Sequence, residues 1–109
     1  MNYEVEVTEQ AESDLRGIFD HIAFSLQSLQ NAVGQLDRLE KAISGLSYMP
    51  ERFRAYDNEP WHSRGLRIMT VDNYCVFYIP DNKEQVVTII RVMYGSRDVN
   101  SQLNNSTND

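Results

Sequence analysis

After residue 8, the period of the hydrophobic residues changes once, near residue 65, and this change constrains the fold most strongly. Before that point, two neighbouring segments place apolar residues at steps of three and four, which is the period of an amphipathic helix. After it, three segments rich in β-branched and aromatic residues are separated by short turns, as in consecutive hairpin strands. Helices grouped before strands predict an α+β domain.

The helical part is predicted to be an antiparallel hairpin. The first helix runs from about residue 9 to residue 26 and begins after Thr8, a residue type that caps helix N-termini. The second begins at Leu29 and ends at Tyr48-Met49-Pro50, since a proline disfavours helix in the residue before it. The apolar positions expected to form the buried stripes are Ala11, Leu15, Ile18, Phe19, Ile22, Leu26, Leu29, Ala32, Leu36, Leu39, Ile43 and Leu46.

One strand is predicted before the helices and three after them, so that the hairpin covers one face of a mostly antiparallel four-stranded sheet and leaves the other face partly open. The predicted strands span residues 3–7, 66–71, 74–79 and 85–93. Residues 50–63 are expected to form an ordered loop pinned by its aromatic side chains. A short final helix is expected to begin at Asp98 and to carry Leu103. A single domain would then span residues 1–103, with a flexible tail at 104–109.

Charge is distributed unevenly along the chain. The chain has 16 acidic and 10 basic side chains and a net charge of −6, which argues against a general binder of polyanions. Residues 1–47 carry three basic and eight acidic side chains, a net charge of −5, whereas residues 48–98 carry seven of each. Six of the eight arginines lie in the second stretch, and the planar guanidinium is suited to gripping phosphate or carboxylate. Scattered surface ion pairs are the alternative explanation.

Few other residues suggest chemistry. Cys75 is the only cysteine, which excludes an intrachain disulfide and a multi-cysteine zinc site and favours a reducing compartment. No apolar run could span a membrane and no signal-like N-terminus occurs, so a cytoplasmic location is expected. Asp57, Glu59 and His62 lie close in sequence but lack a defined ligand geometry, so neither a metal nor a cofactor is predicted.

Three arginines of the strand region have two interpretations each. Arg67 and Arg91 lie within predicted strands, where a guanidinium can bind a ligand or pair with a buried acid, and the buried pair is favoured for Arg91. Arg97 follows Tyr94-Gly95-Ser96, where the chain turns, and can contact a ligand or pair with the adjacent Asp98. Arg91 is expected to share its face with Val87, Ile89 and Met93. An open sheet face bordered by arginines would be available to a ligand.

Five stretches of the chain form an ordered set of motifs. They are residues 5–22, Leu46-x-x-Met49-Pro50, Arg64-x-Leu66-Arg67, residues 73–78 and Arg91-Val92-x-Tyr94-Gly95-x-Arg97-Asp98. Together, over about residues 2–103, they resemble the RelE/ParE superfamily, the toxins of type II toxin–antitoxin modules, also called plasmid stabilisation proteins. The final string resembles the ParE branch.

The resemblance implies a small α+β toxin that a cognate antitoxin inhibits. ParE-like members poison DNA gyrase, whereas RelE-like members cut mRNA in the ribosomal A site with arginine, lysine and tyrosine side chains and without a metal. This sequence departs from the nuclease pattern. Cys75 stands where RelE-type toxins have an arginine, and Leu103 where they have a tyrosine or similar residue. Arg67 is at best a counterpart of the lysines in the first hairpin strand of RelE-type toxins. Of the residues of the nuclease pattern, only Arg97 matches clearly.

We therefore expect a growth-inhibiting toxin that binds a macromolecular target, with DNA gyrase favoured. The alternatives are a ribosome-dependent, metal-independent mRNA endonuclease with Arg97 and Arg67 as candidate catalytic residues, or a degenerate, non-toxic module that binds the antitoxin. The expected partner is a cognate antitoxin, whose amphipathic tail could fold onto the open sheet face and form a hetero-oligomer. Candidate residues for binding the target or the antitoxin are Arg64, Arg67, Tyr94 and Arg97.

Overall fold

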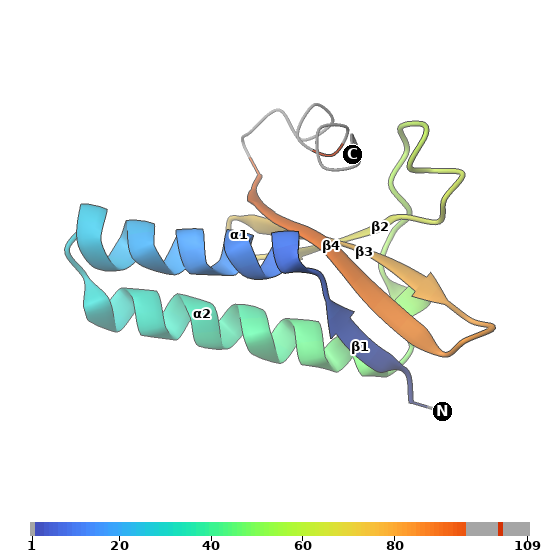
Figure 1. Ribbon diagram of the computed structural model, residues 1–109, viewed down its shortest axis with the longest axis horizontal. Coiled ribbons are helices and arrows are strands. Elements are labelled where there is room, and N and C mark those ends of the chain that lie inside the picture. The colour runs from blue at the N-terminus through green and yellow to red at the C-terminus, as the bar shows by residue number, and fades with distance from the viewer. Residues whose placement is uncertain (1, 96–102, 104–109) are drawn as a thin grey trace.

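A four-stranded sheet and a long helical hairpin make up this computed structural model, which describes residues 2–95 and residue 103 (Figure 1). The predicted order of strands and helices is confirmed, with small shifts at their ends. The helical elements are α1 (Glu9–Asp20), a π turn (His21–Ser25) that continues it, α2 (Leu29–Ser44) and two 3₁₀ turns (Gly45–Ser47 and Pro50–Arg52). The strands are β1 (Glu4–Val7), β2 (Arg67–Val71), β3 (Tyr74–Asp81) and β4 (Val86–Tyr94).

The strands lie in the order β1-β4-β3-β2. β1 runs parallel to β4, with Val7 opposite Ile89, because the chain passes through both helices before it returns to the sheet. β4, β3 and β2 are joined by antiparallel hairpins. The β2–β3 hairpin turns at Asp72, whose φ of 55° is left-handed, as such a tight turn requires. The predicted mostly antiparallel sheet is therefore confirmed.

The helical hairpin covers one face of this sheet. Thr8 caps α1 as predicted, because its Oγ1 accepts the N–H of Ala11 at 3.1 Å. Ala11 of α1 and Leu39 of α2 are then buried against Tyr78 of β3 and Ile89 of β4, none of which retains exposed surface. Burial of each large apolar side chain contributes roughly 1.5–3 kcal/mol. This cluster forms the larger part of the core.

The second face of the sheet is closed, which corrects the expectation of a partly open face. The loop between the second 3₁₀ turn and β2 folds over it and buries Tyr56 and Trp61 against Ile68 and Phe77. The rings of Tyr56 and Phe77 meet edge to face, with centroids 5.8 Å apart. Leu103 is buried in the same cluster. β3 carries apolar side chains on both faces, so both faces require cover, and the aromatic residues of the loop supply it.

A β-bulge in β4 changes the face on which Arg91 lies. The register between β3 and β4 skips Ile90, so the alternation of side chains is reset at this point. Ile89 is consequently buried under the helices, whereas Met93 belongs to the cluster on the opposite face. Arg91 therefore cannot share one face with both of them, contrary to expectation. It pairs instead with Asp14 of α1, which confirms the predicted pairing with a buried acid.

The two helices extend past the sheet, so part of the predicted apolar stripe is exposed (Figure 1). Leu26 and Leu29 are each 61% exposed, which corrects their expected place in the core. The N–H of Leu26 donates to the carbonyl of His21, five residues back, at 3.0 Å, and the extra residue in this turn rotates Leu26 off the stripe. Leu29 lies beyond the β2–β3 turn, whose last contacts with α2 are through Gln35 and Arg38.

Several C-terminal expectations lie outside the described residues. They concern the short final helix, Arg97, Asp98 and the tail at 104–109, so the domain boundary at residue 103 stays a prediction. Within the part of the chain that the structure describes, no helix combines the length and apolar character needed to cross a membrane.

Candidate functional site

Arg67, a candidate for catalysis or binding, is held by backbone carbonyls next to the second 3₁₀ turn. Its Nη1 donates to the carbonyl of Phe53 at 2.6 Å and to that of Glu51 at 3.3 Å. Arg67 lies opposite Tyr78 of β3, whose hydroxyl donates to the carbonyl of Pro50 at 2.6 Å. The two side chains therefore fix the same turn to the sheet, and part of the donor capacity of Arg67 is already used.

Two titratable groups of β3 have pKa values raised above their ordinary values by partial or full burial. Burial raises the pKa of Tyr78 to about 12, although nearby arginines act in the opposite direction. Burial also raises the pKa of the Cys75 thiol, against the influence of Arg54. A nucleophilic cysteine needs a lowered pKa, so the environment of Cys75 does not favour thiolate chemistry.

Arg64 lies on the other side of the sheet from Arg67. Its guanidinium carbon is 5.0 Å from the centre of the Trp61 ring, within cation–π distance, and Trp61 is part of the cluster that closes the second face. Arg64 as a residue is exposed. Arg64 and Arg67 therefore do not lie side by side along one uncovered face, which corrects the arrangement expected from the sequence.

The acidic and histidine side chains of the loop that closes the second face have intramolecular partners. The carboxylate of Glu59 accepts the N–H and the Oγ–H of Ser63 at 2.9 and 2.8 Å, and these bonds lower the pKa of Glu59. Nδ1–H of His62 donates to the carbonyl of Tyr56 at 2.8 Å. Among the described residues, no three histidine, cysteine or acidic side chains are grouped as metal ligands would be.

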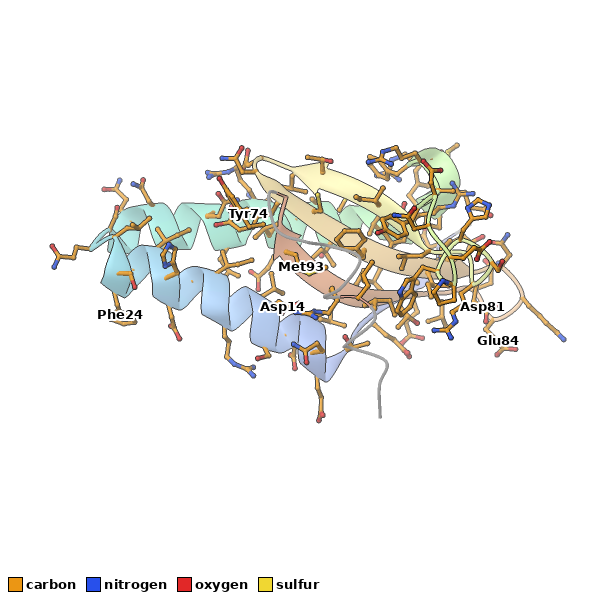
Figure 2. The ribbon with its side chains drawn as sticks, turned by 90° about the horizontal axis from the view of Figure 1, so that it is seen from above. Asp14, Phe24, Tyr74, Asp81, Glu84 and Met93 are labelled. Atoms are coloured by element: carbon orange, nitrogen blue, oxygen red, sulfur yellow. The ribbon has the colours of Figure 1, made fainter. Side chains whose placement is uncertain are left out.

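A groove of about 820 Å³ lies between the helical hairpin and the C-terminal end of β4. Tyr94, a candidate binding residue, lines this groove with 44% of its surface exposed, and its ring meets that of Tyr74 edge to face at 5.7 Å. Figure 2 shows Tyr74, Met93 and Asp14 where β4 passes α1, and all three line the groove. Burial, and then the neighbouring Tyr94, raise the pKa of Tyr74.

The groove combines an apolar floor with cationic groups that come from separate elements. Its apolar lining residues include Ile18, Ile22, Leu26, Val92 and Met93. Arg38 of α2 lines it while its Nε donates to Asp72 at 2.8 Å, and this bond lowers the pKa of Asp72. Arg91 lines it while paired with Asp14. Sequence reasoning missed this combination, because α1, α2 and β4 meet here only in the fold.

The structure brings together only part of the predicted site. Tyr94 lies opposite Tyr74 at one end of β3, whereas Arg67 lies opposite Tyr78 further along the same strand. Tyr94 therefore belongs to the groove, and Arg67 belongs to the turn that follows α2. Arg97 lies outside the described residues. The roles of these residues in binding or catalysis stay predictions.

Comparison with protein families gives one match that covers most of the chain. The sequence profile described as the ParE toxin of the type II toxin–antitoxin system, parDE, matches residues 5–99. No curated protein matches the sequence.

Solved structures share the fold. The chromosomal ParDE toxin–antitoxin system of P. aeruginosa aligns with a TM-score of 0.69 and 18% identity, covering 84% of this chain and 95% of that one. The RelBE2 toxin–antitoxin complex of Mycobacterium tuberculosis aligns with a TM-score of 0.60 and 23% identity, covering 86% and 99%. A free mutant of the E. coli toxin RelE aligns with a TM-score of 0.63 and 15% identity, covering 97% and 94%. The family match over residues 5–99, together with this shared fold, confirms the resemblance to the RelE/ParE superfamily.

Proposed function

This chain belongs to the family of ParE toxins of type II toxin–antitoxin systems, and on that premise we propose that it inhibits growth by binding a protein target, DNA gyrase, in the cytoplasm. We further propose that a cognate antitoxin neutralises it by direct binding. The competing target within the superfamily is mRNA on the ribosome. The choice between these two targets depends on whether the arginine side chains are available to contact the phosphates of an RNA.

The intramolecular contacts of the arginines are the observation that carries the proposal. Cleavage without a metal needs cations that reach the scissile phosphate and stabilise its growing charge. Five of the seven arginines among the described residues instead contact groups of the chain itself. They are Arg38, Arg52, Arg64, Arg67 and Arg91. This supports a toxin that acts through protein contacts, because such contacts do not require a cluster of unpaired cations.

The chemistry of β3 and the charge of the chain support the same choice. Cys75 occupies the position of a nuclease arginine, and burial raises the pKa of its thiol. The replacement of one catalytic cation costs factors of about 100–1000 in rate. The net charge of −6 also disfavours entry into a ribosomal RNA groove, where phosphates dominate binding.

We place the antitoxin in the groove between the hairpin and the end of β4, since the second sheet face is closed. The apolar floor suits the hydrophobic side of an amphipathic segment that folds on binding. Tyr94 lies in the same groove with 44% of its surface exposed and offers a contact for that segment. Two of the similar structures described above, the ParDE system and the RelBE2 complex, contain a toxin and its antitoxin, which is consistent with this partner.

The test is induction of the full-length chain in cells with and without its antitoxin. We expect growth arrest only without the antitoxin, with DNA damage signalling appearing before protein synthesis falls. If protein synthesis stops first and mRNAs are cut within codons, the chain is a ribosome-dependent nuclease and the proposal fails. If growth is unaffected by strong expression, the chain is a non-toxic antitoxin-binding module.

A further inference from the structure

The tip of the helical hairpin is an uncharged surface on a strongly charged protein. We define the uncharged tip as residues 21–36, which contain no Asp, Glu, Lys or Arg, although such residues make up 24% of the chain. The tip includes the π turn and the first half of α2, and one side of it, with Leu26 and Asn31, also lines the groove described above. It projects past the sheet, with Phe24 far from the strands (Figures 1 and 2).

Large apolar side chains are exposed on the uncharged tip. Phe24 is 71% exposed, Leu26 and Leu29 are each 61% exposed, and Val33 is 54% exposed. Exposure of four large apolar side chains within ten residues is unfavourable in water for a monomer. Grouped exposure of this kind indicates a contact surface. The π turn accounts for the exposure of Leu26, which directly follows it, whereas Leu29 and Val33 belong to the first half of α2.

The polar residues of the tip have a chemistry that suits contact with an identical surface. Gln27, Gln30 and Asn31 are exposed, and a side-chain amide both donates and accepts hydrogen bonds, so it can pair with its own copy. In a two-fold contact each patch meets itself, and a charged residue near the axis would face a like charge. A surface without carboxylate, ammonium or guanidinium groups avoids that repulsion.

The charge of the rest of the molecule limits where two copies can meet. Each copy carries a net charge of −6, and residues 1–47 account for −5 of it through eight acids against three bases. Two copies therefore repel one another overall, and the tip is a surface on which neither copy places a charged side chain. A foreign partner that recognised this protein by charge would instead need charged groups at the contact.

We propose that the uncharged tip is a self-association surface, at which a second copy of this chain docks tip to tip about a two-fold axis. Two hairpins joined in this way form a four-helix contact in which Phe24, Leu26, Leu29 and Val33 of each copy are removed from water. The contact is small and made by few side chains, so the dimer is reversible and depends on concentration. Salt strengthens it, because salt screens the repulsion between the acidic bodies.

Sedimentation velocity of the full-length toxin, separated from its antitoxin, tests this proposal over a range of protein and salt concentrations. We expect a monomer–dimer equilibrium that shifts toward dimer as either concentration rises. Leu29→Glu and Leu29→Lys should each raise the dimer dissociation constant at least about tenfold, because each places like charges at the contact. An equal mixture of the two variants should regain dimer at low salt, since unlike charges then meet across the axis.

Met49→Glu provides the matched control, because Met49 is 57% exposed but lies outside the uncharged tip. This variant should dimerise nearly as the wild type does. Unchanged far-ultraviolet circular dichroism and melting of the Leu29 variants would show that they are folded, as the exposure of Leu29 leads us to expect. A wild-type chain that stays monomeric at every protein and salt concentration overturns the proposal. The tip would then be a contact surface for the antitoxin or the target instead. A dimer that Leu29→Glu does not weaken also overturns it.

Discussion

Arg91 of β4 and Asp14 of α1 form a two-pronged ion pair, in which Nε and Nη2 of the arginine donate to the two carboxylate oxygens at 2.7 and 2.9 Å. The same carboxylate accepts the backbone N–H of Val92 at 2.9 Å. β1 ends at Val7, opposite Ile89, so the rest of β4 has no strand on that side. Asp14 supplies an acceptor there and thereby joins the helical hairpin to the sheet.

Loss of the Asp14 carboxylate should destabilise the fold strongly. Both side chains of the pair are only 11% exposed, and Asp14→Ala removes acceptors from the Arg91 guanidinium and the Val92 N–H. We expect the free energy of unfolding to fall by about 3–5 kcal/mol, measured by urea denaturation. Asp37→Ala breaks the exposed Asp37–Lys41 pair at 3.0 Å and should cost no more than about 0.5 kcal/mol. Equal losses in the two variants would contradict the structural role of Asp14.

Tyr78 should make stability depend on pH in alkaline solution. Its pKa rises from 10.0 to about 12 on folding, so the neutral phenol is stabilised in the folded state. The folded state then holds this proton more tightly, and the contribution, full below pH 10, is lost as pH rises from 10 toward 12.

Tyr78→Phe isolates this contribution. It should lower the free energy of unfolding by about 1–3 kcal/mol at neutral pH, because the buried carbonyl of Pro50 loses its donor. The variant should also lose stability less steeply than the wild type above pH 10, in urea titrations at a series of pH values. Parallel curves for the two proteins would show that Tyr78 is not the titrating group.

The two neighbouring leucines of α2 should respond differently to truncation. Leu39 has no exposed surface and packs in the main core, whereas Leu36 is half-buried and lines a groove on the outside of the hairpin. Leu39→Ala should cost about 2–5 kcal/mol by leaving a cavity. Leu36→Ala should lower the free energy of unfolding clearly less. The sequence alone predicts an equal loss, because both leucines belong to the apolar positions expected to be buried. Thermal or urea unfolding of both variants compares the two values directly, and a larger loss for Leu36 would reverse this assignment.

The arginines should separate into structural and functional groups. Arg67→Ala should lower the free energy of unfolding by about 1–3 kcal/mol, because the carbonyls of Phe53 and Glu51 lose a donor. Arg97→Ala should reduce toxicity and leave stability unchanged, which is the role predicted from its motif. Growth after induction and melting temperature are measured for each variant in parallel. Full toxicity of Arg97→Ala would remove this residue from the functional site.

The sequence predicted those parts of the fold that depend on local pattern. The helical spacing, the Thr8 cap, the short turns between the last strands and the β-branched strands each depend on neighbouring residues, and all were predicted correctly. The pairing of Arg91 with a buried acid followed from a charge placed inside an apolar strand. Its partner, Asp14, lies 77 positions away, and no local pattern identifies it.

The errors arose where one extra residue or one loop changes the surroundings of many others. A π turn moved Leu26 off the stripe, and a bulge at Ile90 separated the faces of Ile89 and Met93. A prediction that assumes a constant period along a helix or strand cannot anticipate the extra residue in the π turn or the bulge residue Ile90. The second sheet face was expected to be open because the sequence places Trp61 in a loop without indicating which surface that loop covers. The expectation that Arg64 and Arg67 lie side by side depended on that open face.

The most direct test of the account is supercoiling of relaxed plasmid by purified DNA gyrase in the presence of this chain. We expect the toxin to inhibit supercoiling as its concentration rises, and its antitoxin to restore activity when added first. Translating ribosomes given the same toxin preparation should keep their mRNA intact. Unchanged supercoiling together with mRNA cut on the ribosome would contradict the account and identify the chain as a nuclease.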